Sequence, residues 1–115
     1  MISQPELAAA AGLLREHSRI LVACHESPDG DALGSLIGMG KSLQDAGWDV
    51  AFWAPGEAAL PADYLWLGLA NVARTPPSDA SERVLLAVDC GSAERLGVDG
   101  PATVANAVTS INLDH

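Results

Sequence analysis

Residues 19–35 read "RILVACHESPDGDALGS", and this stretch decides the fold. It opens with a nearly continuous apolar run at 19–24, which is typical of a strand buried on both faces of a parallel sheet. A Pro-Asp-Gly turn at 28–30 then breaks the extended chain. We therefore expect a buried strand whose carboxyl end opens directly onto polar residues.

The following segment, "ALGSLIGMGKSLQDAG" at 32–47, predicts a helix that starts directly after Asp31 and stops at Gly47. Gly34, Gly38 and Gly40 each cost about 1 kcal/mol of helix propensity relative to Ala, so we expect close packing on the sheet to explain them. The residues predicted to share the buried face are Leu33, Leu36, Ile37, Gly40 and Leu43.

The same pattern returns later in the chain. "VLLAVDCGSAERLG" at 84–97 predicts a buried strand that ends at Asp89, small residues and a short helix, and "ATVANAVTSINLDH" at 102–115 predicts a helical half followed by the strand "SINL". Before both of these segments, "WDVAFWAP" at 48–55 is a further strand candidate. Strand and helix alternating at this spacing imply right-handed βαβ crossovers, hence an α/β fold with a parallel sheet flanked by helices.

Two segments are less informative. Residues 3–18 predict a helix with Ser3 as N-cap and Glu6 completing a capping box, and residues 57–73 predict one short helix or two turns.

Cys24 and Cys90 each end an apolar run, which favours small buried hydrophobes over a disulfide framework, and no CxxC spacing is present.

Length and composition limit the class of protein. With 115 residues, 49% of them hydrophobic and 18% charged, the chain is expected to form one small folded domain. The net charge of −9 argues against a nonspecific duplex-DNA binder, which needs many Lys and Arg contacts to phosphates. The apolar runs are too short to span a bilayer and the N-terminus lacks a signal peptide, so we expect no membrane association and a cytoplasmic location.

Polar residues follow three of the predicted strands. Because the carboxyl ends of parallel strands meet at one edge of a sheet, the three groups are predicted to converge there. Each residue alone has an ordinary interpretation as a turn residue, a helix cap or a surface histidine. Together, carboxylates crowded at one edge would repel one another unless cations lay between them. The converging residues are His25, Asp29, Asp31, Asp89, Asp114 and His115.

Oxygen and imidazole ligands without thiolates suit hard divalent cations. Mn²⁺ is the first choice, with Mg²⁺, Zn²⁺ or Co²⁺ as alternatives. Two such ions about 3.5–4 Å apart bind a phosphate between them and lower the pKa of a bridging water. The sequence therefore predicts phosphoester hydrolysis.

These residues resemble the motifs of the DHH phosphoesterases, a family that includes exopolyphosphatases, manganese pyrophosphatases and an exonuclease of recombination repair. "HESPDGDALGS" at 25–35 looks like the first motif, "VDCGSAERLG" at 88–97 the second, and "NLDH" at 112–115 the start of the Asp-His-His motif. The resemblance spans the chain from about Ile20. It is strongest to the bacterial branch that hydrolyses short oligoribonucleotides, 3′-phosphoadenosine-5′-phosphate (pAp) or cyclic di-AMP.

The resemblance also implies roles for individual residues. His25 and Asp29 would hold the first metal, Asp31 and His115 the second, and Asp89 would bridge the two. Asp114 would orient His115 without binding metal itself. The candidate catalytic residues are Asp89, His115 and Asp114.

The family pattern continues beyond the given sequence. A second His, a later Asp ligand and a C-terminal substrate-binding domain are expected after His115. We therefore expect residues 1–115 to be the N-terminal part of a DHH catalytic domain of a longer protein, and to be inactive alone. The resemblance is compatible with a homodimer.

Two alternatives stay open. A pyrophosphatase or exopolyphosphatase would share the metals but would need a basic pocket, and only Lys41 and Arg95 lie near the motifs. A noncatalytic module would keep the scaffold and bind metal or nucleotide without turnover. The complete set of His25, Asp29, Asp31 and Asp89 argues against this second alternative.

Overall fold

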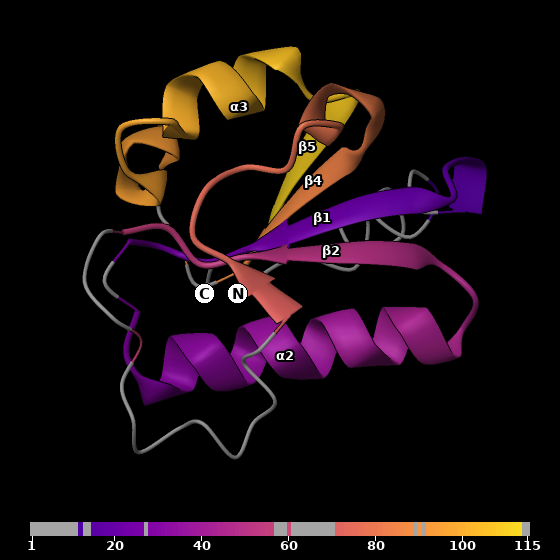
Figure 1. Cartoon of the computed structure of the whole chain (residues 1–115). Coiled ribbons are helices and arrows are strands. Elements are labelled where there is room, and N and C mark those ends of the chain that lie inside the picture. Colours follow the sequence, from indigo (N-terminus) through magenta and orange to yellow (C-terminus); the bar gives the residue numbers. More distant parts are fainter. Residues whose placement is uncertain are drawn as a thin grey trace.

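The computed structural model describes residues 12, 15–26, 28–56, 60, 71–88, 90 and 92–113. Within them, five strands form one parallel sheet in the order β3-β2-β1-β4-β5. Helices cover both faces of this sheet (Figure 1). The predicted α/β fold is confirmed. The strands are β1 (Arg19–Ala23), β2 (Asp49–Trp53), β3 (Val72–Ala73), β4 (Val84–Val88) and β5 (Thr109–Leu113), and the helices are α2 (Gly30–Asp45), η3 (Ala80–Glu82), η4 (Ala93–Leu96) and α3 (Gly100–Asn106).

The order of the strands reverses at the centre of the sheet. From β1 the chain runs outward through β2 to β3, then returns to the other side of β1 and runs through β4 to β5. Ala23 lies opposite Ala87, and Val88 lies opposite Leu113, so the carboxyl ends of β1, β4 and β5 share one edge. In open α/β sheets ligands bind at such a reversal, outside the carboxyl ends of the strands.

The two faces of the sheet carry separate cores. Along β1, Ile20 and Val22 pack beneath α2, whereas Leu21 and Ala23 pack beneath η4 and α3. All five residues of β4 are buried. Figure 1 shows α2 on one side of the sheet and α3 on the other. Burial on both faces is the reason that these strands have near-continuous apolar sequences.

Helix α2 begins two residues earlier than predicted. Its first residue is Gly30 and its N-cap is Asp29, so the expectation of a start after Asp31 was wrong. The Asp29 carboxylate accepts a hydrogen bond from the Ala32 N–H, which has no partner within the helix. Asp31 lies inside the first turn and therefore does not occupy the N-cap position. The predicted apolar face is confirmed, because all five of its residues are buried. Gly47 follows the C-cap with a φ of 105°, which favours glycine.

The glycines of α2 have different explanations. A Cβ at Gly40 would overlap the buried ring of Phe52 on β2, so this residue is held small by close packing, as expected. A Cβ at Gly34 or Gly38 would meet nothing within 4 Å, so packing does not explain these two residues. Only one of the three predictions of close packing is therefore confirmed.

The remaining segments agree in part. Val72–Ala73, within the segment expected to be helical, pairs with β2 as a short strand because its backbone completes that strand's edge. The segment after β4 is the 3-10 turn η4, and both cysteines are buried without a disulfide. Of the helix predicted at 3–18, residues 12, 15 and 16 are helical. The predicted caps Ser3 and Glu6 lie outside the described residues, as does most of 57–71.

No helix in the described part of the chain is both long and apolar enough to cross a membrane.

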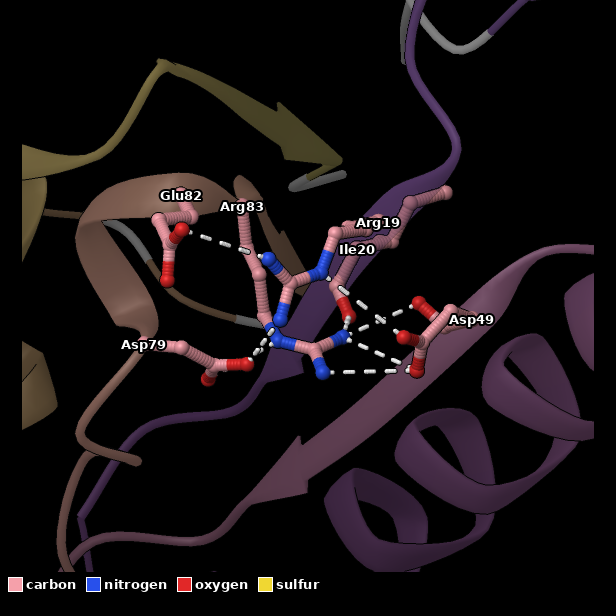
Figure 2. Close-up of polar contacts among 6 residues, drawn as sticks. All are labelled: Arg19, Ile20, Asp49, Asp79, Glu82 and Arg83. Carbon is pink, nitrogen blue, oxygen red and sulfur yellow. Dashed lines mark hydrogen bonds and ion pairs between the residues drawn. The ribbon is translucent and has the colours of Figure 1, made fainter.

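The opposite, amino-terminal edge of the sheet is closed by an ion-pair cluster (Figure 2). The buried Arg83 guanidinium donates to the carbonyl oxygens of Ile20 and Asp49, at 3.1 and 3.0 Å, and to the carboxylates of Asp49 and Asp79, at 3.3 and 3.1 Å. Arg19 pairs with Asp49, Asp79 and Glu82. These contacts tie together the starts of β1, β2 and β4.

The charges of this cluster shift each other's pKa. The hydrogen bond from Arg83 holds the pKa of Asp79 below its ordinary value, helped by the positive charges of Arg83 and Arg19. Burial alone would lower the pKa of Arg83, but the hydrogen bond to Asp79 and the charge of Asp49 outweigh it and raise that pKa. Both groups therefore stay ionised at neutral pH.

Candidate functional site

His25 lies just beyond the carboxyl end of β1 and is half-buried. Its Nδ1 is 2.8 Å from the Glu26 carbonyl oxygen. A carbonyl oxygen can only accept, so Nδ1 is the donor and carries the proton. In the neutral form of an imidazole with this tautomer, the lone pair is on Nε2. A backbone carbonyl that fixes the tautomer in this way is the usual arrangement for a histidine that binds metal through its other nitrogen.

Asp29 and Asp31 flank the start of α2, and both are exposed. The Asp29 Oδ1 accepts from the Ala32 N–H over 2.9 Å, and its carbonyl accepts from the Leu33 N–H over 3.0 Å. Asp31 lies in the first turn, where a negative charge interacts favourably with the helix dipole. Both carboxylates thus stabilise the helix and also present oxygen atoms to solvent at the carboxyl edge of the sheet.

The rest of the predicted site falls outside the described residues. Asp89 follows β4, and Asp114 and His115 follow β5, so the strands that precede them end at the same edge as β1. Among the residues that the structure describes, no group of three or more His, Cys, Asp or Glu side chains could hold a metal ion. The structure therefore places His25, Asp29 and Asp31 on one loop and helix start without joining them into a three-ligand group.

A backbone contact that the sequence did not predict joins the first motif to the second. The Glu26 N–H donates to the Arg95 carbonyl oxygen over 2.6 Å. The same Glu26 residue accepts from His25 through its own carbonyl, so the loop after β1 is braced against η4. This contact joins a backbone amide and a backbone carbonyl from two different loops. Hydrophobic periodicity carries no information on such a contact, so the sequence did not predict it.

The turn η4 is itself held tightly. Leu96 is buried, and Gly97 has a φ of 85° and lies against Glu26 and Pro55. A Cβ at Gly100 would overlap the Ala93 carbonyl oxygen, so the start of α3 approaches the turn closely. The second motif therefore provides a fixed platform beside the His25 loop.

A cavity of about 150 Å³ lies on the α3 face of the sheet, between β4, β5, η4 and α3. Its walls are mainly apolar, with Leu85, Leu96 and Val104 among them, and Ser92, Ser110 and Asn112 supply polar groups. The Cys90 thiol, also in this wall, donates to the Ser92 carbonyl over 3.2 Å. The cavity adjoins the second motif, but it contains none of the predicted metal ligands that the structure describes.

The donor set fits a hard divalent cation. One imidazole with a fixed tautomer and two solvent-facing carboxylates come from a single loop and helix start, and no thiolate is among them. Such donors suit Mn²⁺ or Mg²⁺. These three residues do not by themselves form a metal site within the described part of the chain, so a cation held here would need further ligands.

Comparisons with known proteins agree with this architecture. The structure is similar to the crystal structure of an exopolyphosphatase-related protein from Bacteroides fragilis, with a TM-score of 0.85 and 21% sequence identity. The similarity covers 100% of this chain but 36% of that protein, so the chain spans about a third of its length. A search of curated proteins gave no match. Residues 19–115 match the model of the DHH family, N-terminal domain, and the chain belongs to the DHH family.

Proposed function

We propose that the protein is a divalent-metal-dependent phosphoesterase that hydrolyses short nucleotide substrates: oligoribonucleotides, pAp or cyclic di-AMP. The observation that carries the proposal is the position of the His25–Asp31 motif. It lies at the reversal of strand order beside β1 and β4, in a chain of the DHH family. Oxygen and nitrogen donors at this point are suited to a metal-assisted reaction on a phosphate.

Five residues would hold the metal. His25 and Asp29 would bind one ion, Asp31 and His115 another, and Asp89 would bridge them, with Asp114 positioning His115. When bound, divalent cations neutralise phosphate charge and lower the pKa of a water molecule. Mn²⁺ is the preferred ion, and Mg²⁺ or Co²⁺ are alternatives.

The described residues have clear tasks in such a reaction. The Glu26 carbonyl keeps the proton on His25 Nδ1, and the N-cap bond of Asp29 restricts the rotation of its carboxylate. In hydrolysis, water adds to phosphorus, one phosphorus–oxygen ester bond breaks, and the leaving alkoxide takes a proton. These residues would act by holding their ligand atoms in place before the substrate arrives.

The distribution of charge favours small substrates. The chain carries six basic and 15 acidic residues, and Arg19 and Arg83 are committed to the ion-pair cluster at the other edge. A long polyanion would meet little compensating charge on the described surface. A substrate with few phosphates, neutralised by bound cations, meets no such obstacle.

A second candidate is hydrolysis of pyrophosphate or polyphosphate. It is favoured by one observation, the similarity in fold to a protein described as exopolyphosphatase-related. This activity would use the same metal ligands, so the two candidates differ in substrate and not in the proposed site.

The test is an assay of the complete natural protein that carries this chain, with Mn²⁺, on pApA, pAp, cyclic di-AMP and tripolyphosphate. Turnover of the nucleotides above that of tripolyphosphate supports the first candidate, and the reverse order supports the second. Asp89→Ala is expected to abolish turnover. The control Asp45→Asn removes an exposed charge from the far end of α2 and is expected to keep it. Wild-type turnover in Asp89→Ala would refute the metal mechanism.

A further inference from the structure

Positive charge is scarce in this chain, and three of its six basic residues are already engaged in ion pairs or hydrogen bonds. Arg19 and Arg83 pair with carboxylates at the amino edge of the sheet. Arg74 follows β3 and donates through Nε to the Ala54 carbonyl over 2.7 Å and through a terminal nitrogen to the Pro55 carbonyl over 3.3 Å. The six basic residues are Arg15, Arg19, Lys41, Arg74, Arg83 and Arg95.

The other three basic residues are exposed but lie in different places. Arg15 precedes β1, on the amino side of the sheet, and Lys41 lies in the second half of α2. Arg95 lies in η4, which follows the carboxyl end of β4. Within the described part of the chain, Arg95 takes part in none of the ion pairs.

The backbone of Arg95 is fixed beside the candidate metal ligands. Its carbonyl accepts from the Glu26 N–H over 2.6 Å, and its own N–H donates to the Ser92 carbonyl over 3.1 Å. The next residue, Leu96, is buried and anchors the turn. His25 is bonded to the carbonyl of the same Glu26. Glu26 is therefore hydrogen-bonded both to His25, a proposed metal ligand, and to the exposed residue Arg95.

We infer that Arg95 binds a phosphate group of the substrate beside the metal centre. This inference rests on the proposed function, because it assigns a residue to the phosphate that the proposed reaction requires. A guanidinium presents a planar set of N–H donors that matches phosphate oxygens in a bidentate manner. Because the backbone of Arg95 is already held by hydrogen bonds, less conformational entropy is lost when its side chain binds a phosphate. The residue is exposed, so a ligand can reach it.

Steady-state kinetics of the complete natural protein with Mn²⁺ and pApA test this role. A phosphate contact present both before and during the reaction affects KM more than kcat. Arg95→Ala is therefore expected to raise KM by about tenfold or more, with kcat changed by less than about threefold. Arg95→Lys keeps the positive charge but loses the planar, bidentate guanidinium. Its KM is therefore expected to lie between those of wild type and Arg95→Ala.

A binding measurement gives a second readout that does not need turnover. Calorimetric titration of pAp in Ca²⁺ is expected to show the same loss of affinity in Arg95→Ala, and inorganic phosphate is expected to become a weaker competitive inhibitor. Arg15→Ala, which removes another exposed positive charge, on the amino side of the sheet, serves as the matched control. The affinity of this control for pAp is expected to match that of wild type. The thermal unfolding midpoints of all these variants are also expected to match wild type.

Three negative outcomes are distinct. An active wild type whose Arg95→Ala variant keeps the wild-type KM and pAp affinity overturns this inference and leaves the proposed function standing. Equal losses in Arg95→Ala and Arg15→Ala also overturn it, because they would reflect net charge alone. A wild type that hydrolyses no phosphoester in the presence of Mn²⁺ overturns the proposed function, and the inference falls with it.

Discussion

The Asp29 carboxylate accepts a hydrogen bond from the Ala32 N–H over 2.9 Å, so a residue proposed to bind metal also caps helix α2. Structural and chemical roles are thus combined in one side chain. They can be separated, because asparagine is as good an N-cap as aspartate but a much poorer ligand for a hard cation.

The capping role predicts a specific order of stabilities. Asp29→Ala is expected to lower the free energy of unfolding by about 1 kcal/mol, because the first turn loses its acceptor. Asp29→Asn is expected to stay within a few tenths of a kcal/mol of wild type. Urea unfolding followed by circular dichroism measures both. Equal destabilisation by the two substitutions would contradict the assigned cap.

The contact between Gly40 and Phe52 predicts opposite effects of one methyl group at two positions of α2. Gly40→Ala is expected to destabilise the protein by about 1–3 kcal/mol, since the new methyl would displace a buried ring. Gly38→Ala meets nothing within 4 Å and is expected to stabilise the protein by about 1 kcal/mol through helix propensity. Thermal unfolding of the pair is the measurement, and equal shifts would refute the packing argument.

The ion-pair cluster predicts unequal costs for its two arginines. Arg83→Met is expected to cost on the order of 3 kcal/mol, because a buried cation is lost and its carbonyl and carboxylate partners are left unpaired. Arg19→Met, at a side chain that is 37% exposed, is expected to cost about 1 kcal/mol or less. Denaturant unfolding compares them. A cost of Arg19→Met equal to that of Arg83→Met would contradict the importance of burial.

The pKa of Asp79 predicts how stability depends on pH. Its pKa is lower in the folded state than the ordinary value of 3.8, first because of the Arg83 hydrogen bond. The carboxylate therefore stabilises the fold at pH values above 3.8, and this contribution is lost as the pH falls below 3.8 through the folded-state pKa.

Comparison with Asp79→Asn isolates this effect. The difference in urea midpoint between wild type and Asp79→Asn is expected to be constant from pH 7 down to about pH 5 and to shrink below about pH 4. A difference that grows as the pH falls would have the wrong sign for a carboxylate with a lowered pKa.

The sequence predicted the scaffold well because its strands and its long helix are defined by local patterns. The apolar run before His25 gives β1, and the spacing of Leu33, Leu36 and Leu43 gives the buried face of α2. The start of α2 was misplaced because Asp29 and Asp31 are both good caps, and only the backbone conformation decides between them.

Contacts between distant segments could not be predicted in the same way. The bond from Glu26 to Arg95 and the Arg83 cluster join backbone groups and charges that lie far apart in the chain. They depend on the registers of β1, β2 and β4. Strands buried on both faces have near-continuous apolar sequences, which carry little of the alternation that would set a register. The strand β3 was missed because two residues are too few to show a period.

The central claim, that the carboxyl edge of the sheet binds a divalent metal, is tested most directly by the Mn²⁺ affinity of the complete natural protein. Calorimetric titration of wild type, Asp29→Asn and the control Asp45→Asn is the measurement. Loss of about 100-fold or more of the affinity in Asp29→Asn, with an unchanged unfolding midpoint and wild-type affinity in Asp45→Asn, is the predicted result. Wild-type affinity for Mn²⁺ in a folded Asp29→Asn protein would contradict it.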